Sequence, residues 1–462
     1  MKMNEKIKVG LLPLYIKLYD DYSQSMRPKV DAFHKAISDK LKAAGLDVVD
    51  VPVCRVKEEF AAAVAKFEAD QAEAIVTLNL AYSPSLESSD VLAATRLPIL
   101  VLDTTPDYVY DFSTPAEALS YNHGIHGVQD LCNLLRRNHV PFEIFAGHWE
   151  KSDVIQRVAY AAKACRIANA MKNARIGIVG DPFAGMGDFA IPYDELKRTI
   201  GMEVVKFTGN SFPEITEADL EAEYKKDAST FRVEGVSDEL YRKAARVGLG
   251  IRRWVDENHF DGFTMNFLST AAGTPFSAMP FAEATKALAD GIGYAGEGDV
   301  MTTALVSSLM KVYKETTFCE MFCPDWYGNT IYLNHMGEFN PVCSKGNLRL
   351  TAKPFPYTTA GETTAVVGSF KPGRAVFSCL APQGDGQYAY IITQVEMLDV
   401  PDDNGHRDMI NGWFRPCMPV PKFLEAYSRL GGIHHASLVY DADIELIKLF
   451  GHYMGWNVQV IE

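Results

Sequence analysis

Two patterns of hydrophobic and polar positions alternate along the first third of the chain. Continuous apolar runs, typical of strands that are buried on both faces, occupy residues 6–16, 46–53, 72–80 and 98–105. Amphipathic segments, with apolar positions three or four residues apart, predict helices over residues 27–45, 58–70 and 126–138. This alternation of strand and helix predicts a parallel sheet that carries helices on its faces.

A second α/β pattern begins near residue 174. It predicts strands over residues 174–180, 202–209 and 260–267 and a long helix over residues 238–258. Beyond residue 317 the pattern changes to shorter strand-like runs, which Gly, Pro and Asp clusters separate and which include residues 330–335, 375–381 and 388–398. Such runs are typical of a β-rich domain.

The expected fold class is therefore α/β, with two doubly wound α/β domains followed by a β-rich C-terminal domain. We expect an N-terminal α/β domain at residues 1–172, a central α/β domain at residues 173–317 and the β-rich domain at residues 318–462. A chain of 462 residues is long enough for two or three such domains.

Composition excludes several classes of partner. The formal net charge of −14 argues against nucleic acid and against an anionic membrane surface, because both need a basic footprint on the protein. No uninterrupted apolar stretch is long enough to cross a bilayer, and the N-terminal apolar run is too short for a signal peptide. The eight cysteines are scattered along the chain, so we expect reduced thiols and a cytoplasmic location.

Two glycine-rich stretches follow predicted strands. GDPFAGMGDF (180–189) fits neither G-x-G-x-x-G nor a P-loop, so it indicates a plain strand-to-helix turn. GYAGEGD (293–299) is compatible with a phosphate loop, a carboxylate presented to a metal, or a turn. It has no lysine, and its two acidic side chains would repel phosphate, which argues against a phosphate loop and leaves a metal or a turn. We expect Asp299 to cap the helix that starts near Val300.

The pair Cys319 and Cys323 raises the alternative of a zinc site with His335. Their C-x₃-C spacing is allowed, but no second Cys or His pair follows at finger-like spacing. We therefore interpret both cysteines as structural thiols.

The C-terminal half holds five candidates for metal chemistry, namely Glu297, Glu320, His335, His434 and His435. Each alone has an ordinary explanation as a turn residue or a hydrogen-bonded structural histidine. Glu320, however, stands in an apolar run where burial of a carboxylate requires a cation or donors. Two carboxylates with two imidazoles suit a divalent transition metal such as Mn, Co, Fe or Zn. No local motif joins these residues.

Four segments carry a resemblance to a known family. GYAGEGD (293–299), FCEMF (318–322), NHMGEF (334–339) and LGGIHHASL (430–438) occur in the order and approximate spacing of the metal-site segments of L-arabinose isomerase. The chain thus resembles the metal-dependent aldose–ketose isomerases, which include L-arabinose isomerase and L-fucose isomerase. Weaker similarity extends over NLAYSPS (79–85), HGIHGVQDL (123–131), AGHWE (146–150) and DGFTMNF (261–267).

The resemblance implies a set of roles for the candidate residues. The implied ligands of a metal ion, usually Mn²⁺ in the family, are Glu297, Glu320, His335 and His435. Glu297 and Glu320 are also the implied catalytic acid/base pair, acting through a cis-enediol(ate). His434 would lie beside the metal and contact the sugar. The order of roles within the His434–His435 pair stays open.

The resemblance also implies a homotrimer or homohexamer with sites at subunit interfaces. His126 would be the contribution of a neighbouring subunit to the sugar site; the alternative is a solvent-facing histidine at a helix start. Tyr82, Phe267 and Met186 are candidates for the wall of the sugar pocket by their positions, although apolar packing is the commoner fate of such residues.

The chain departs from the L-arabinose isomerase pattern where that enzyme contacts its sugar. LLPLYIKLYDD (11–21) has no sugar-contacting polar residues, and Leu268 stands where the family has an acidic residue. The substrate therefore stays open between a pentose and a deoxyhexose, such as L-arabinose or L-fucose. The alternatives are a non-catalytic sugar-binding or regulatory homologue, and a related metal-dependent epimerase or lyase.

Overall fold

A computed structural model describes residues 6–22, 24–346 and 348–462. The chain forms two compact units. Unit 1 consists of Met1–Asn169 with Leu449–Gly455, and unit 2 consists of Ala170–Lys448 with Trp456–Glu462. Helices α6 (Val154–Lys172) and α13 (Ile444–Tyr453) each run through a boundary of this division.

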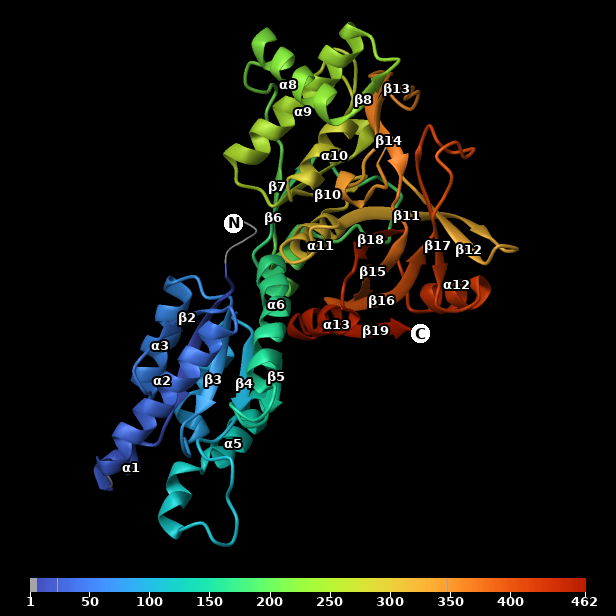
Figure 1. Cartoon of the computed structure of the whole chain (residues 1–462). Coiled ribbons are helices and arrows are strands. Elements are labelled where there is room, and N and C mark those ends of the chain that lie inside the picture. The colour runs from blue at the N-terminus through green and yellow to red at the C-terminus, as the bar shows by residue number, and fades with distance from the viewer. Residues whose placement is uncertain (1–5, 23, 347) are drawn as a thin grey trace. The chain divides into compact units, whose positions relative to one another are not determined.

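Unit 1 contains a parallel five-stranded sheet in the order β2-β1-β3-β4-β5 (Figure 1). Its strands are β1 (Lys8–Leu14), β2 (Asp47–Asp50), β3 (Ala74–Asn79), β4 (Ile99–Asp103) and β5 (Phe142–Ala146). Its helices include α1 (Lys17–Tyr22), α2 (Arg27–Ala43), α3 (Lys57–Ala69), α4 (Ser89–Ala94) and α5 (Gly124–Arg137). Strand β3 is buried along its whole length, as its continuous apolar run predicts.

Unit 2 begins with a smaller parallel sheet in the order β10-β9-β6-β7. Its strands are β6 (Arg175–Val179), β7 (Glu203–Lys206), β9 (Gly262–Met265) and β10 (Gly293–Gly296). The helices of this region are α7 (Tyr193–Thr199), α8 (Glu217–Thr230), α9 (Asp238–Glu257), α10 (Phe281–Ala289) and α11 (Val300–Met310). The sequence prediction of a second run of parallel strands and helices is confirmed here.

The rest of unit 2 is built on a mixed ten-stranded sheet in the order β19-β16-β15-β18-β11-β12-β17-β14-β13-β8. Its strands are β8 (Arg232–Glu234), β11 (Thr316–Asp325), β12 (Thr330–Asn334), β13 (Arg349–Lys353), β14 (Thr363–Ser369), β15 (Gly373–Gly384), β16 (Gln387–Met397), β17 (Ile410–Pro416), β18 (His435–Tyr440) and β19 (Asn457–Ile461). Helix α12 (Val420–Arg429) also belongs to this part. The fold is thus a mixed α/β structure with parallel sheets and a β-rich C-terminal region.

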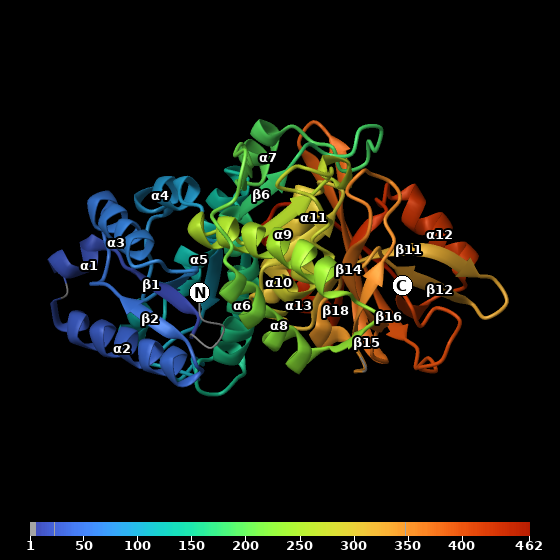
Figure 2. The same cartoon turned by 90° about the horizontal axis from the view of Figure 1, so that it is seen from above.

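Helix α11 is the structural centre of unit 2. All of its residues are buried, and it packs against β9 and β10 of the parallel sheet and against β11, β15 and β18 of the ten-stranded sheet (Figures 1 and 2). Its side chains are apolar or carry small hydroxyl groups, and a helix without a charged face belongs in the interior of a protein. Because α11 contacts both sheets, its N-terminus brings the end of β10 close to β11 and β18.

In the described part of the chain, no helix is long and apolar enough to cross a membrane. The eight cysteines are free thiols there; Cys319 is buried, whereas Cys323 is exposed. The three-domain division at residues 172 and 317 stays a prediction.

The contact between β10 and α11 gives a first testable prediction. A Cβ atom at Gly293 would lie 2.5 Å from the carbonyl oxygen of Thr303 and 2.6 Å from the Cβ of Ser307. Gly293→Ala should therefore push α11 away from the sheet and lower the free energy of unfolding by about 1–3 kcal/mol in urea titrations.

Gly405→Ala is the matched control, because the described residues place no atom within 4 Å of that added Cβ. Its effect should stay within about 0.5 kcal/mol. Equal stability of the two variants would contradict the packing argument.

Candidate metal centre

The glycine loop after β10 presents Glu297 in a backbone conformation that residues other than glycine uncommonly adopt. Glu297 has a φ of 62°, and Gly298 follows with a φ of 87°. A left-handed backbone at a non-glycine residue costs energy and is retained where the surrounding structure enforces it, often at functional sites. A Cβ at Gly296 would lie 2.7 Å from Cε1 of His335, so the glycine lets this imidazole reach the loop.

Asp299 ends the loop and starts α11. Its Oδ1 accepts a hydrogen bond from the backbone N–H of Thr302, which confirms the predicted helix cap. Its Oδ2 lies 2.9 Å from Nδ1 of His435 on β18, and both side chains are fully buried. One carboxylate thus caps the helix and holds an imidazole of the neighbouring sheet.

Strand pairing brings the remaining candidates together. Glu320 on β11 stands directly opposite His435 on β18 and, on its other side, opposite Asn334 at the end of β12. Side chains at directly paired positions of antiparallel strands are close enough to interact. Glu320 on β11, His435 on β18 and His335, which immediately follows β12, therefore lie close together although they are distant in the sequence.

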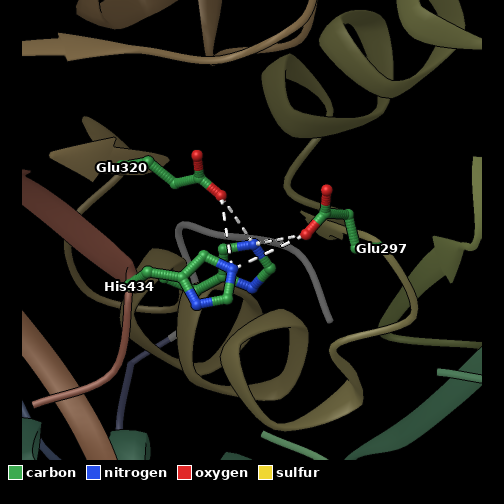
Figure 3. Close-up of side chains that lie close together, drawn as sticks. Glu297, Glu320 and His434 are labelled. Atoms are coloured by element: carbon green, nitrogen blue, oxygen red, sulfur yellow. Dashed lines mark ion pairs between the residues drawn. The ribbon is translucent and has the colours of Figure 1, made fainter. Parts of the chain in front are cut away.

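Four of these side chains form a compact group of possible metal ligands, namely Glu297, Glu320, His434 and His435. One ligand atom from each residue lies within 4.8 Å of the other three (Figure 3). Nε2 of His435 lies 2.8 Å from Oε1 of Glu320, and Oε2 of Glu297 lies 3.6 Å from Nε2 of both His434 and His435.

His335 lies beside this group. Its Nε2 is 3.6 Å from Oε1 of Glu320, and its side chain is almost completely buried. Both His434 and His335 therefore lie close enough to the two glutamates to be possible ligands of a cation. The sequence prediction that His335 is a ligand and His434 a sugar contact stays a prediction.

The cluster couples the ionisation of its members. Burial raises the pKa of Glu297, but the contacts with His434 and His435 lower it by more. The pKa of Glu297 therefore lies well below its usual range. Burial lowers the pKa of His435, yet Asp299, Glu297 and Glu320 raise it well above its ordinary value. Charged carboxylates with imidazoles that attract protons form a site where a divalent cation can replace those protons.

Each of the three imidazoles has a carboxylate at its Nδ1 atom. Asp188 lies 2.6 Å from Nδ1 of His434, Asp299 2.9 Å from that of His435, and Glu338 2.7 Å from that of His335. At His434 and His435 the contact is a hydrogen bond, which fixes the tautomer and frees the other nitrogen as a ligand, an arrangement common around metal-binding histidines.

Two features make the group suitable for a cation. Among the described residues, Nε2 of His434 and Oε2 of Glu297 are buried atoms for which no hydrogen-bond partner is found. Buried polar atoms are normally paired, so atoms that face one another unpaired indicate a shared ligand. Carboxylate and imidazole donors together suit a divalent transition metal.

A cavity of about 140 Å³ opens beside Glu297 and His335. Its wall is largely apolar and includes Phe267, one of the candidates for the sugar pocket. The other lining residues are Met265, Met279, Phe281, Tyr294, Gly296, Met336, Glu338, Phe355 and Tyr357. The cavity can accept a small molecule that also reaches the carboxylate–imidazole cluster.

The remaining candidates occupy other positions. Met186 is half-buried in the connection between β6 and α7, and it does not line this cavity in the described structure. Tyr82 and His126 belong to unit 1, where their rings approach to 6.1 Å. His126 has His123 as a second neighbour, with ring centroids 4.5 Å apart.

Sequence reasoning missed Asp188 and Glu338. Asp188 lies in GDPFAGMGDF, which indicated only a turn, because its partner His434 is 246 residues away. Glu338 follows His335 by three residues in NHMGEF, and an acidic residue so close to a candidate ligand was the available signal.

Two family models match the part of the chain that contains this cluster. A family model described as the L-arabinose isomerase central domain matches residues 202–315, and one described as the L-arabinose isomerase C-terminal domain matches residues 315–457. Together the two matches cover more than half of the chain and include Glu297, Glu320, His335, His434 and His435.

Individual relatives that match most of the chain are also named L-arabinose isomerase. L-arabinose isomerase of Acidothermus cellulolyticus is 23% identical, with 96% of this chain and 91% of the relative covered. That of a Nocardioides species is 25% identical, with 77% and 74% covered. Among solved structures, GanP, a glucose-galactose binding protein from Geobacillus stearothermophilus, aligns with 12% identity and a TM-score of 0.17 over 66% of this chain and 90% of that chain. A TM-score this low supports no conclusion about fold or ligand.

The double role of Asp299 gives a second prediction. Asp299→Ala removes the cap of α11 and leaves Nδ1 of the buried His435 unpaired, so unfolding free energy should fall by about 2–4 kcal/mol. Asp299→Asn keeps a good capping side chain and should recover at least half of that loss. Urea titration of both variants checks this expectation; equal losses would show that the cap contributes nothing.

Proposed function

Because this chain belongs to the L-arabinose isomerase family of aldose–ketose isomerases, we propose that it interconverts an aldose and its ketose at a divalent metal ion. The observation that carries the proposal is the group of two carboxylates and two imidazoles whose ligand atoms lie within 4.8 Å of one another. Carboxylate and imidazole donors suit a divalent metal ion, and such an ion can polarise the carbonyl group of a sugar.

The ion would be held by Glu297, Glu320 and His435, together with His335 or His434. We propose Mn²⁺, on the family resemblance; another divalent transition metal fits the same donors. When bound, such an ion polarises the carbonyl group and neutralises the charge that develops on the two sugar oxygens.

The residues of the chain would move the protons. Isomerisation transfers one proton from C2 to C1 and another between O1 and O2, through a cis-enediol. Glu297 and Glu320 are the proposed acid/base pair, because both carboxylates face the cluster and both have a lowered pKa. A carboxylate that is charged at neutral pH can accept the C2 proton and return it to C1.

The substrate is proposed to be a pentose or a deoxyhexose, such as L-arabinose or L-fucose. The cavity beside Glu297 and His335 has an apolar wall that includes Phe267 and Met336, and its volume suits a small sugar. We retain Tyr82, Met186 and His434 as proposed sugar contacts.

We further propose a homotrimer or homohexamer in which His126 comes from a neighbouring subunit. The connection between β4 and α5 in unit 1 exposes Tyr108, Val109, Tyr110 and Phe112. Exposed apolar patches of this kind are typical of protein–protein contacts.

The proposed location is the cytoplasm. The free thiols are compatible with a reducing compartment of that kind.

Removal of either carboxylate tests the proposed function. Glu297→Gln and Glu320→Gln should each lower aldose isomerisation by about 10²–10⁴-fold, since each removes an acid/base group and a metal donor. The measurement is product formation by NMR with Mn²⁺-loaded protein and a panel of pentoses, hexoses and deoxysugars. Metal content is determined in parallel.

Glu425→Gln is the control, because Glu425 lies on α12 in an ion pair with Lys422, outside the cluster. Unchanged turnover in either cluster variant would exclude the proposed mechanism. A product with only one inverted carbon, or a cleaved product, would instead indicate an epimerase or a lyase. Sugar binding without any product would indicate a non-catalytic homologue.

The enediol route predicts exchange with solvent. In deuterated water, the proton that a carboxylate has taken from carbon can exchange with solvent before it is returned. Deuterium should therefore appear at C1 of the ketose or C2 of the aldose. NMR of the products after partial turnover measures this incorporation. Complete absence of deuterium at both carbons would favour a hydride shift between them.

A further inference from the structure

The segment between β6 and α7 contacts the candidate metal centre at several points. The backbone N–H of Phe183 donates a hydrogen bond to the carbonyl oxygen of Glu297, and a Cβ at Gly298 would lie 2.8 Å from Cα of Pro182. Further along the segment, the ring of Phe189 stacks on the imidazole of His435 at a centroid distance of 5.0 Å. This segment therefore packs against both the glycine loop that carries Glu297 and the histidine His435 at the start of β18.

Asp188 makes the contact that has a direct chemical consequence. Its Oδ2 accepts a hydrogen bond from the backbone N–H of His434 at 3.1 Å and lies 2.6 Å from Nδ1 of the same residue. The two contacts involve both the backbone and the ring of His434. They therefore restrict where the residue lies and how its imidazole is rotated.

His434 needs such a restraint more than the other two imidazoles. Its side chain is 36% exposed, whereas the side chain of His435 is fully buried and that of His335 is 6% exposed. Packing alone holds a buried ring, but a half-exposed ring can rotate into solvent unless a hydrogen bond prevents it. Asp188 provides that hydrogen bond.

The contact also decides which nitrogen is free. With a carboxylate at Nδ1, the proton of a neutral imidazole resides on Nδ1 and the lone pair on Nε2. Nε2 of His434 lies 3.6 Å from Glu297 and 3.8 Å from Glu320, so the lone pair is directed into the cluster (Figure 3). There it can bind a cation or accept a hydrogen bond from a sugar hydroxyl.

We propose that Asp188 is a positioning residue that fixes the orientation and tautomer of His434, so that Nε2 of His434 faces the cation and substrate. This inference rests on the proposed function, since it assigns Asp188 a role at that same site. Asp188 acts only through His434 and does not itself reach the reacting atoms.

Asp188 is a better test of such a role than Asp299. Asp299 also caps α11, so its variants lose stability for a second reason. The side chain of Asp188 contacts His434 from a segment outside the regular elements and is 35% exposed. Substitution of Asp188 should therefore leave the thermal midpoint of the metal-free protein nearly unchanged.

The test is a double-mutant cycle with Asp188→Ala, His434→Ala and the double variant. Two quantities are measured on the full chain: the dissociation constant of Mn²⁺ by isothermal titration calorimetry, and kcat/KM for aldose isomerisation. Asp188→Ala should weaken Mn²⁺ binding or lower kcat/KM by about 10–100-fold. In the His434→Ala background the same substitution should change both quantities by less than twofold, because its target is gone.

Two further variants complete the design. Asp188→Glu keeps the carboxylate and should restore part of the loss. Asp181→Ala is the matched control from the same segment, because the Asp181 carboxylate pairs with Lys206 and its side chain is 73% exposed. It should behave as the wild type in both measurements.

The outcomes separate this inference from the proposed function. Wild-type protein that neither binds Mn²⁺ nor isomerises any aldose overturns both. If the wild type binds Mn²⁺ without isomerising, the proposed function fails and the Mn²⁺ cycle still decides the role of Asp188. Equal effects of Asp188→Ala in both backgrounds, or no effect on either quantity, overturn the inference. Should Asp188→Ala fail to fold, the isosteric Asp188→Asn replaces it in the cycle.

Discussion

The two oxygens of Asp299 hold the candidate site of unit 2 together. One oxygen satisfies a free backbone N–H at the start of α11, and the other holds the imidazole of His435 at the start of β18. Both contacts are buried, where an unpaired polar group costs about 1–3 kcal/mol. The position of the helix, the strained loop that carries Glu297 and the first residue of the strand are therefore coupled through one side chain.

This coupling explains why a costly backbone conformation at Glu297 persists. The loop is bounded by β10, which pairs with β9, and by α11, which both sheets enclose. Gly296 and Gly298 sit where a Cβ would collide with His335 and with Pro182. The surroundings thus leave the Glu297 side chain directed at Glu320 and the histidines, and the strain is offset by the packing of the elements on either side.

Charge balance makes the cluster suited to a cation. Five carboxylates surround three imidazoles, namely Asp188, Glu297, Asp299, Glu320 and Glu338. Three of them contact Nδ1 atoms and so orient the rings, while Glu297 and Glu320 face the free Nε2 atoms. Burial alone disfavours so much negative charge; the imidazoles offset part of it, and a divalent ion bound there would offset more. The arrangement therefore links the tautomer and the orientation of each ring to the position of the donors that a cation would use.

Local patterns in the sequence determined much of the fold. Continuous apolar runs gave strands such as β1 and β3, amphipathic periodicity gave helices such as α2 and α9, and the Asp299 cap followed from its position before an apolar run. Motif resemblance also selected Glu297, Glu320 and the histidines. These features depend on neighbours within a few residues or on a recognisable order of segments, so a single sequence contains them.

Only the tertiary structure decided how those residues meet. The register that sets Glu320 opposite His435 depends on pairing between β11 and β18, which are separated by more than a hundred residues. The same holds for Asp188, whose partner His434 lies on a different element and leaves no periodic signal near residue 188. Long-range pairings are determined by how buried surfaces fit together, and that fit is a property of the folded chain rather than of any local stretch.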